Sequence, residues 1–523
     1  MNLALYKIRD DLEDGDWGLR TSAADYKPVP VRSMSGVKLS LYVRTPKPSI
    51  PRWQKELLSI AADQGSRLLR ELQNQSTGAL LLIERRGHRF VLVYGSGRHA
   101  VDSTKIETGF GLRVAANVID PESLKGVDTR SIIGSGRSQA VSMPSAGPLH
   151  RLGIEPTADL VRYLEGRPST ELATGIAGGD VLRLTLKSFS LNSLAEKIDE
   201  IVAAYDSVAY KESFPFLDYF VRVPRSNSEL RSRLNAEVGK LLLEGSDNLD
   251  LMNPEIDRAG RPERFVLKYG RKTLELGEVS TESVSEVVSK WGVADPLSAL
   301  KVNVFYEDVE VPRSIPLLHF VAAEIELDGR LFAPCSGVWY RVDGDHLASM
   351  NERISLLTDL TGVLPFGVWH RGYKREEDYN KHALPSGSKH MVLDKALFYS
   401  KGGRNQKVEV CDLITAEKQL ICVKKMVDSA TLSHLFAQGA VSAQLLKDNR
   451  TYRDVVLGHL RRIDPNAAIG SFSDWTIVFA VATDRPGSLA KSLFFFSKVN
   501  LEIAVRAIHG TQMRVALAKI DHE

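Results

Sequence analysis

Apolar and polar residues alternate in two short runs near the carboxyl end of the chain, and a helical pattern follows them. Residues 408–414 and 420–425 have the alternation of half-buried strands, and residues 415–419 join them in hairpin fashion. In residues 431–446, apolar side chains recur three and four positions apart, which predicts an amphipathic helix. The pattern therefore predicts a strand, turn, strand and helix in succession.

Further elements flank this unit and extend the predicted order to α-β-β-β-α-(α)-β-α-β. They are a helix over 345–358, a strand over 391–399, a helix over 450–460, a strand over 475–481, a helix over 488–506 and a strand over 513–520. Helices and strands are also mixed throughout the preceding residues. We expect an α+β / α/β multidomain chain, with domains over 1–188, 189–330 and 331–523.

The composition is that of a globular protein and excludes several classes. With 523 residues, 43% of them hydrophobic and 25% charged, the chain can form several cores. It has no apolar run long enough for a membrane span, and the acidic first residues argue against a secretion signal. Cys335, Cys411 and Cys422 lack the spacing of a zinc site and favour a reducing compartment, so we expect a cytoplasmic protein without a membrane partner.

Basic residues are concentrated toward the carboxyl end. Residues 361–523 hold 23 Lys and Arg against 16 Asp and Glu, although the net charge of the whole chain is only +3. A nucleic acid is therefore the expected partner, and a solvated charged face is the alternative. The residues expected to contact nucleic acid are Arg371, Lys374, Arg375, Lys425, Arg450, Arg453, Arg461 and Arg462.

An acid and a lysine occupy positions in the two predicted strands where apolar residues are expected. Asp412 would share a face with Val408, Val410 and Ile414, and Lys424 lies on the neighbouring strand. Burying either charge alone is costly. One use of such a pair is a metal-dependent phosphodiester site, in which the carboxylate holds Mg²⁺ or Mn²⁺ and the lysine orients water or offsets phosphate charge. The alternative is an ordinary cross-strand ion pair.

The order of the elements over residues 331–523 resembles the restriction-endonuclease-like core of the PD-(D/E)xK superfamily, written α-β-β-β-α-β. The resemblance implies a nuclease in which Asp412 holds the acid position of the second strand and Lys424 the lysine of the third. Cys422 stands where that motif has a glutamate, and a thiol is a poor Mg²⁺ ligand. Either another acid completes the site or catalysis is lost.

Several residues could complete such a site. Glu377 is the main candidate for the missing acid and for metal binding. The other acids are its neighbour Glu376, together with Glu352 and Asp394. His434 and Gln438 lie one turn apart on the helix after the third strand and would point toward the same site.

The chain also resembles, over nearly its full length, a sporadically distributed bacterial family of unknown biochemical function, whose members lie among phage-defence and restriction genes. The segments that carry the resemblance are FVLVYGSGRHAVDSTKIETGFGLRVAANVID (90–120), GVWYRVDGD (337–345), EEDYN (376–380), EVCDLI, LICVKK, SATLSHLFAQGAVSAQLL and LFFFSKVNL (493–501). The resemblance implies antiviral defence.

Three functions are therefore expected as alternatives. The first is a metal-dependent nuclease, and the second is a nucleic-acid-binding or sensor protein on a degenerate nuclease fold. The third is a non-enzymatic defence adaptor. Homo-oligomers, a phage-encoded trigger or a neighbouring defence protein are the further partners considered.

Overall fold

The computed structural model describes residues 2–523 apart from 21–24, 33, 35, 46–47, 49, 52, 74, 134–137, 245–248, 252–261, 307–308, 374, 394–396, 400–406 and 428. It is a mixed α+β protein that divides into two compact units, which confirms the predicted fold class. The first unit comprises residues 1–130 and 138–217, and the second comprises 131–137 and 218–523. The predicted domain boundaries at 188 and 330 stay a prediction.

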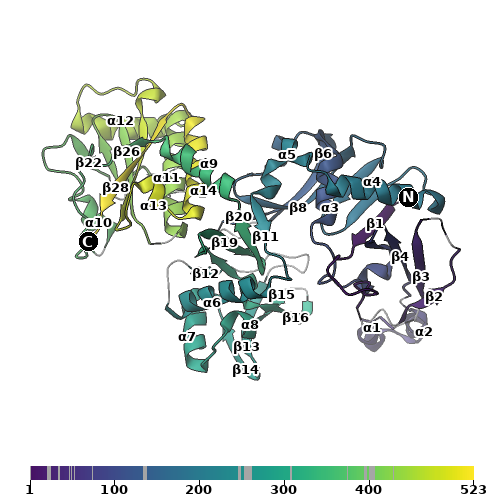
Figure 1. Cartoon of the computed structure of the whole chain (residues 1–523). Helices are drawn as coiled ribbons and strands as arrows, with labels where there is room; N and C mark the ends of the chain where they lie inside the picture. The colour runs from purple at the N-terminus through teal and green to yellow at the C-terminus, as the bar shows by residue number, and fades with distance from the viewer. Residues whose placement is uncertain are drawn as a thin grey trace. The chain divides into compact units, whose positions relative to one another are not determined.

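A large sheet forms the first unit, with strand order β2-β3-β4-β5-β1-β10-β9-β8-β6-β7 (Figure 1). Its strands are β1 (Asn2–Lys7), β2 (Lys27–Val29), β3 (Lys38–Arg44), β4 (Gly78–Arg85), β5 (His88–Gly95), β6 (Ile119–Ser131), β7 (Ser138–Gly147), β8 (Asp159–Pro168), β9 (Gly175–Gly178) and β10 (Leu182–Thr185). The helices of this unit are α1 (Gln54–Ile60), α2 (Asp63–Glu71), α3 (Phe110–Val118), α4 (Leu194–Asp206) and α5 (Tyr210–Ser213).

The second unit begins with short antiparallel sheets. One has the order β11-β20-β19-β18, a second pairs β12 with β17, and a third has the order β14-β13-β15-β16. The strands are β11 (Phe220–Arg222), β12 (Leu249–Leu251), β13 (Pro262–Tyr269), β14 (Lys272–Leu276), β15 (Lys301–Tyr306), β16 (Val309–Pro316), β17 (Val321–Ala323), β18 (Ile325–Leu327), β19 (Arg330–Cys335) and β20 (Val338–Val342). The helices α6 (Ser228–Glu244), α7 (Thr281–Trp291) and α8 (Pro296–Ala299) contribute buried apolar side chains to the core of these sheets.

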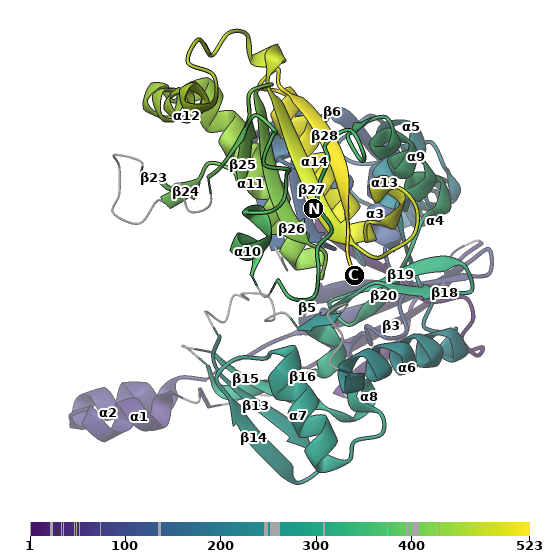
Figure 2. The same cartoon turned by 90° about the vertical axis from the view of Figure 1, so that its left-hand side faces the viewer.

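A mixed sheet forms the rest of the second unit, with order β21-β28-β27-β26-β25-β22 (Figure 2). Strands β26, β27, β28 and β21 run parallel to one another, whereas β25 is antiparallel to both β26 and β22. The strands are β21 (Thr358–Asp359), β22 (His390–Val392), β25 (Leu413–Thr415), β26 (Gln419–Lys425), β27 (Thr476–Thr483) and β28 (Arg514–Asp521), and a separate ladder joins β23 (Leu397–Tyr399) to β24 (Lys407–Glu409). The helices are α9 (Gly344–Ser355), α10 (Glu376–Asn380), α11 (Ser429–Asp448), α12 (Arg450–Ile463), α13 (Leu489–Ser492) and α14 (Phe495–His509).

This mixed sheet is buried on both faces. On one face, α11 packs against β26 and β27, and the ring of Phe436 meets the ring of Phe479 edge to face at 5.0 Å. Gly439 allows this close approach, because a Cβ atom there would lie 2.5 Å from the Phe479 ring. On the other face, Trp369 and Tyr379 pack over apolar residues of β26, β27 and β28.

Among the described residues, no helix is both long enough and apolar enough to cross a membrane.

Candidate functional site

The predicted strand over 408–414 is broken in the structure, so that prediction is wrong in its middle. Residues 407–409 form β24 and pair with β23, whereas 413–415 form β25 and pair with β22 and β26. Between them, the carbonyl of Val410 accepts a hydrogen bond of 2.6 Å from Ser442 Oγ on α11. Because the ladder is interrupted here, strand alternation does not place the side chain of Asp412.

The carboxylate of Asp412 accepts a hydrogen bond from the backbone of β26, where the ladder with β25 is interrupted. Its Oδ2 accepts a 2.8 Å hydrogen bond from the backbone N–H of Val423 on β26, and its Oδ1 accepts one of 3.3 Å from Asn380 Nδ2 on α10. Its own N–H donates to the carbonyl of Ile421 at 3.0 Å. Only 7% of Asp412 is exposed. The side chain is therefore fixed at the point where β25 and β26 separate.

Burial raises the pKa of Asp412 to about 7, the largest effect at this position. The hydrogen bond from Val423 lowers this pKa, Glu409 and Glu376 raise it, and Lys424 lowers it least. The carboxyl groups of Glu409 and Glu376 therefore each lie near enough to that of Asp412 to repel it.

Lys424 forms an ion pair with Glu376, at 2.7 Å between Nζ and Oε1. The alternative of a cross-strand ion pair between Asp412 and Lys424 is wrong, because the Asp412 carboxylate turns toward Val423 and Asn380. Both partners of the observed pair are partly exposed, at 29% for Lys424 and 35% for Glu376. The acid brought to Lys424 is thus Glu376 of α10, the neighbour of the main candidate Glu377.

Asn380 is a site residue that sequence reasoning missed. It is fully buried, and its Oδ1 is without a hydrogen-bond partner. A buried acceptor of this kind normally has a partner. It belongs to the same amide group that donates to Asp412, so an unsatisfied oxygen lies beside a buried carboxylate. Its position in the segment EEDYN, next to three acids, was the available signal.

The remaining predicted site residues lie elsewhere or make no direct contact. Glu352 is exposed on α9, which packs against α13 and α14, and Asp394 lies outside the described residues. His434 is exposed on α11 and Gln438 is half-buried. Within the described chain, no hydrogen bond or ion pair joins these two side chains to Asp412 or Lys424.

Cys422 is fully buried on β26, and burial raises its pKa well above the usual range. The thiol is therefore neutral near pH 7. In the part of the chain that the structure describes, no group of three or more His, Cys, Asp or Glu side chains is arranged to hold a metal ion.

The predicted basic residues fall into two groups. Arg371 and Lys425 both lower the pKa of His522, so these three groups lie near one another, although burial is the larger cause of that shift. They gather where the parallel strands β26, β27 and β28 end, the edge at which α/β sheets bind ligands. Arg375 is the N-cap residue of α10, beside Glu376, and Lys374 lies outside the described residues.

The second basic group lies on α12, and part of it has a structural role. Arg453 donates to the carbonyls of Leu446 and Lys447 at the end of α11. Arg461 Nε donates to the carbonyl of Ala467 at 3.2 Å. Arg450 and Arg462 are exposed. That these four arginines contact nucleic acid stays a prediction, and two of them also bind backbone carbonyls.

Residues 3–521 match the model of a family described as "Family of unknown function (DUF6119)". The chain belongs to this family. The comparison with curated proteins and the comparison with solved structures found no match. The predicted resemblance to an uncharacterised family is thus confirmed at that level, and membership of DUF6119 assigns no reaction.

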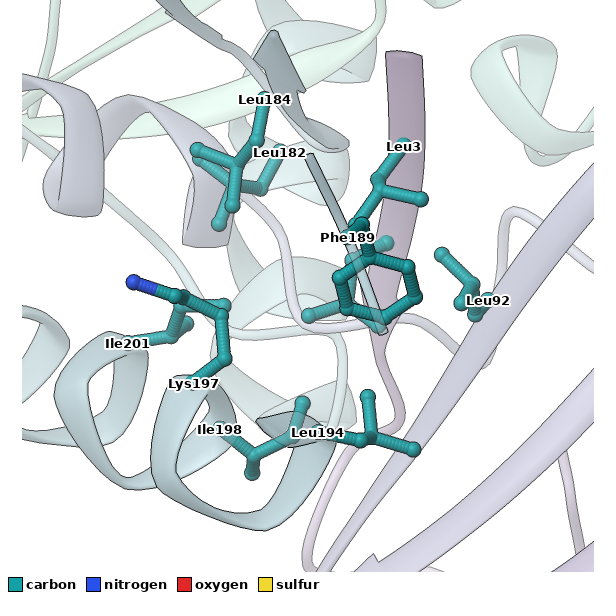
Figure 3. Close-up of a pocket in the computed structure, with 10 residues that line it drawn as sticks. Leu3, Leu92, Leu182, Leu184, Phe189, Leu194, Lys197, Ile198 and Ile201 are labelled. Carbon is teal, nitrogen blue, oxygen red and sulfur yellow. The ribbon is translucent and has the colours of Figure 1, made fainter. Parts of the chain in front are cut away.

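The first unit of this DUF6119 chain contains an apolar pocket between strands of its large sheet and α4 (Figure 3). Its walls are mainly leucine and isoleucine, for example Leu182, Leu194 and Ile198. The ammonium group of Lys197 is paired with Glu200 at 2.8 Å. The pocket therefore offers no polar group for chemistry, and the candidate site stays at Asp412, Glu376 and Lys424.

Proposed function

We propose that this DUF6119 chain is a phage-defence protein that acts on nucleic acid as a metal-dependent nuclease. One observation carries the proposal: the buried carboxylate of Asp412 lies where two strands separate, near the ion pair of Lys424 and Glu376. A buried acid with a raised pKa, grouped with a second acid and a lysine, is typical of active sites. The defence context rests on the family resemblance, which also suggests a phage-encoded trigger or a neighbouring defence protein.

The residues present fit a hard divalent cation such as Mg²⁺ or Mn²⁺. Asp412 and Glu376 repel one another, and the Oδ1 of Asn380 has no donor, so a cation would relieve both conditions. Mg²⁺ commonly binds one or two carboxylates and completes its coordination with water and substrate phosphate. Asp412 and Glu376 would hold the cation, with Asn380 as a third oxygen donor. When bound, it activates water and stabilises charge on the leaving oxygen.

The other residues have distinct tasks in this mechanism. Lys424 would hold a phosphate oxygen or orient the attacking water once its ion-pair partner Glu376 binds the cation. Arg371 and Lys425 bind the neighbouring phosphates of the strand, because they lie at the same edge of the sheet. Val423 holds the Asp412 carboxylate in place through its N–H group.

The order of elements supports a PD-(D/E)xK-like arrangement. Glu376 lies on the helix that precedes β22, Asp412 immediately precedes β25, Lys424 lies on β26, and α11 follows. Asp412 and Lys424 correspond to the acid and the lysine that the superfamily pattern has on its second and third strands. Cys422 still departs from that pattern, so Glu376 supplies the carboxylate that Cys422 does not.

The test is incubation of the purified chain with plasmid, single-stranded DNA and total RNA, in Mg²⁺, Mn²⁺ or EDTA. We expect cleavage that needs metal and that Asp412→Asn, Glu376→Gln and Lys424→Ala each reduce at least a hundred-fold. Lys389→Ala, an exposed lysine of the same unit, is the control. Mn²⁺ should also raise the Tm of the wild type and leave that of Asp412→Asn unchanged. No cleavage and no metal-dependent Tm shift would contradict the proposal.

Cys422 favours one alternative, a nucleic-acid-binding or sensor protein on a degenerate nuclease fold. The thiol is buried and neutral where the motif has an acid, which is the expected sign of lost catalysis. In that case, wild type and Lys424→Ala bind nucleic acid equally at moderate salt, and neither cuts it with or without a phage lysate as trigger.

A further inference from the structure

The sheet β14-β13-β15-β16 has one covered face and one open face. Alternate residues of β13, including Phe265 and Leu267, are buried in the core together with α6, α7 and α8. The other face of β13 carries Arg264 and Lys268, which are exposed, with the half-buried Val266 between them. Because side chains alternate along a strand, this open face is a continuous surface over β13 and β15.

An arginine and an aromatic ring stack at one end of this face. Arg264 lies directly opposite Phe305 in the register of β13 and β15, and its guanidinium carbon is 3.8 Å from the centre of the Phe305 ring. Phe305 is half-buried, and the Arg264 side chain is 47% exposed. Glu275 approaches the guanidinium from the side, with 3.4 Å between Nη1 and Oε2. The stacked pair is thus partly exposed to solvent, with the Glu275 carboxylate beside the guanidinium.

Two lysines lie opposite each other at the other end. Lys268 is the register partner of Lys301, and both are exposed. Like charges directly opposite in an antiparallel pair are destabilising. Among the residues that the structure describes, neither lysine has an ion-pair partner. The polar side chains of Asn303 and Ser314 form a register pair between the two ends.

We propose that this open face binds single-stranded nucleic acid. Lys268 and Lys301 would hold phosphates, which removes their mutual repulsion, and unpaired bases would stack on Arg264 and Phe305. The inference rests on the proposed action on nucleic acid and adds the class of substrate. An extended strand fits a flat face, whereas the bases of a duplex are already stacked on each other. An acidic peptide would neutralise the two lysines but would not use the stacked side chains of Arg264 and Phe305.

The proposal is tested by fluorescence anisotropy with labelled single-stranded oligonucleotides, using the full chain in EDTA. The variant Lys268→Glu/Lys301→Glu should lose at least ten-fold in affinity. Its log–log salt slope should fall by about 1.4, as expected for two lost phosphate contacts at about 0.7 each. The matched control is Lys240→Glu/Lys290→Glu, which changes charge equally on α6 and α7 and should keep its affinity. Phe305→Ala should weaken binding about five-fold or more, with no change in the salt slope.

Several outcomes would overturn the inference. Equal losses in both double variants would show only a general charge effect. Tighter binding of duplex than of single strands, or equal competition by polyglutamate, would assign the face to another partner. Absence of single-strand binding by the wild type would also overturn the inference.

The inference and the proposed nuclease can fail separately. If binding is retained in Asp412→Asn and lost in Lys268→Glu/Lys301→Glu while no cleavage is seen, the binding face stands and the nuclease fails. Cleavage by wild type with unchanged binding in the double lysine variant would sink the binding face alone.

Discussion

Two sheets of the second unit differ in how they are covered. The mixed sheet of β21 to β28 is buried by α11 and its neighbours on one face and by Trp369 and Tyr379 on the other. The sheet of β13 to β16 is covered on one face only. Polar side chains in the first sheet can therefore be placed only at a break or at strand ends, as for Asp412 and Lys424. In the second sheet, polar side chains such as Lys268, Lys301 and Asn303 lie along the open face beside Val266 and Phe305.

The same difference is visible in the sequence of the strands. β27 is an almost uninterrupted apolar run, TIVFAVAT, as expected for a parallel strand buried on both faces. In β13, by contrast, PERFVLKY alternates buried and exposed positions in its central part. The first pattern predicts a protected core, and the second predicts a surface on which charged residues can gather without a burial penalty.

The largest expected effect is at Phe479, in the covered sheet. Phe479→Ala should lower the free energy of unfolding by about 3–5 kcal/mol, because it removes a fully buried ring in contact with Phe436. Chemical denaturation monitored by circular dichroism would measure this. A loss below about 1 kcal/mol would contradict the tight packing of α11 against this sheet.

The next effect is a pH dependence that depends on Asp412. Because its folded pKa is raised to about 7 from 3.8, the folded chain retains a proton that the unfolded chain loses between about pH 4 and pH 7. Stability should therefore fall as pH rises through this window, by up to about 4 kcal/mol, and become level above it. Denaturation of wild type and Asp412→Asn at several pH values isolates this group, since the other carboxyl groups are common to both. A constant difference between the two proteins from pH 4 to pH 8 would contradict the raised pKa.

A smaller effect is expected at Gly439. Gly439→Ala places a methyl group against the ring of Phe479, so α11 must shift, at a cost of about 1–3 kcal/mol. Gly458→Ala, on α12 with open space around it, is the control and should be neutral or stabilising. Thermal unfolding of both variants is the measurement, and equal Tm changes would argue against the close approach.

The smallest effect is at Phe305, on the open face. Phe305→Ala should cost about 1 kcal/mol or less, because the ring is half-buried and its contact with Arg264 is solvent-exposed. Denaturation in parallel with Phe479→Ala compares an aromatic residue of each sheet. A cost at Phe305 as large as that at Phe479 would mean that the ring has a structural role on a packed face.

Hydrophobic periodicity predicted the elements of the last 180 or so residues well. The helix 431–446 and the strands 420–425, 475–481 and 513–520 correspond to α11, β26, β27 and β28. These elements are long or strongly apolar, so local pattern determines them. The strands predicted over 391–399 and 408–414 each divide between two ladders, which depends on partners far away in the sequence.

The candidate site was only partly predictable. Asp412 and Lys424 were noticed because charged residues interrupt apolar strands. The ion-pair partner of Lys424 depends on where α10 packs, and spacing alone could not separate Glu376 from Glu377. The role of Asn380 depends on its contact with a residue 32 positions away, for which the sequence has no local signal.

The order in which strands occur in the mixed sheet has a consequence for biosynthesis. β28 lies between β21 and β27, although it is the last of these strands to be made. Until residues 514–521 have left the ribosome, β21 lacks its partner and β27 has an open edge, which is a template for association with other chains. The sheet that carries Asp412 and Lys424 is therefore completed only when β28 has been synthesised, so a nuclease built on it would be inactive before that point.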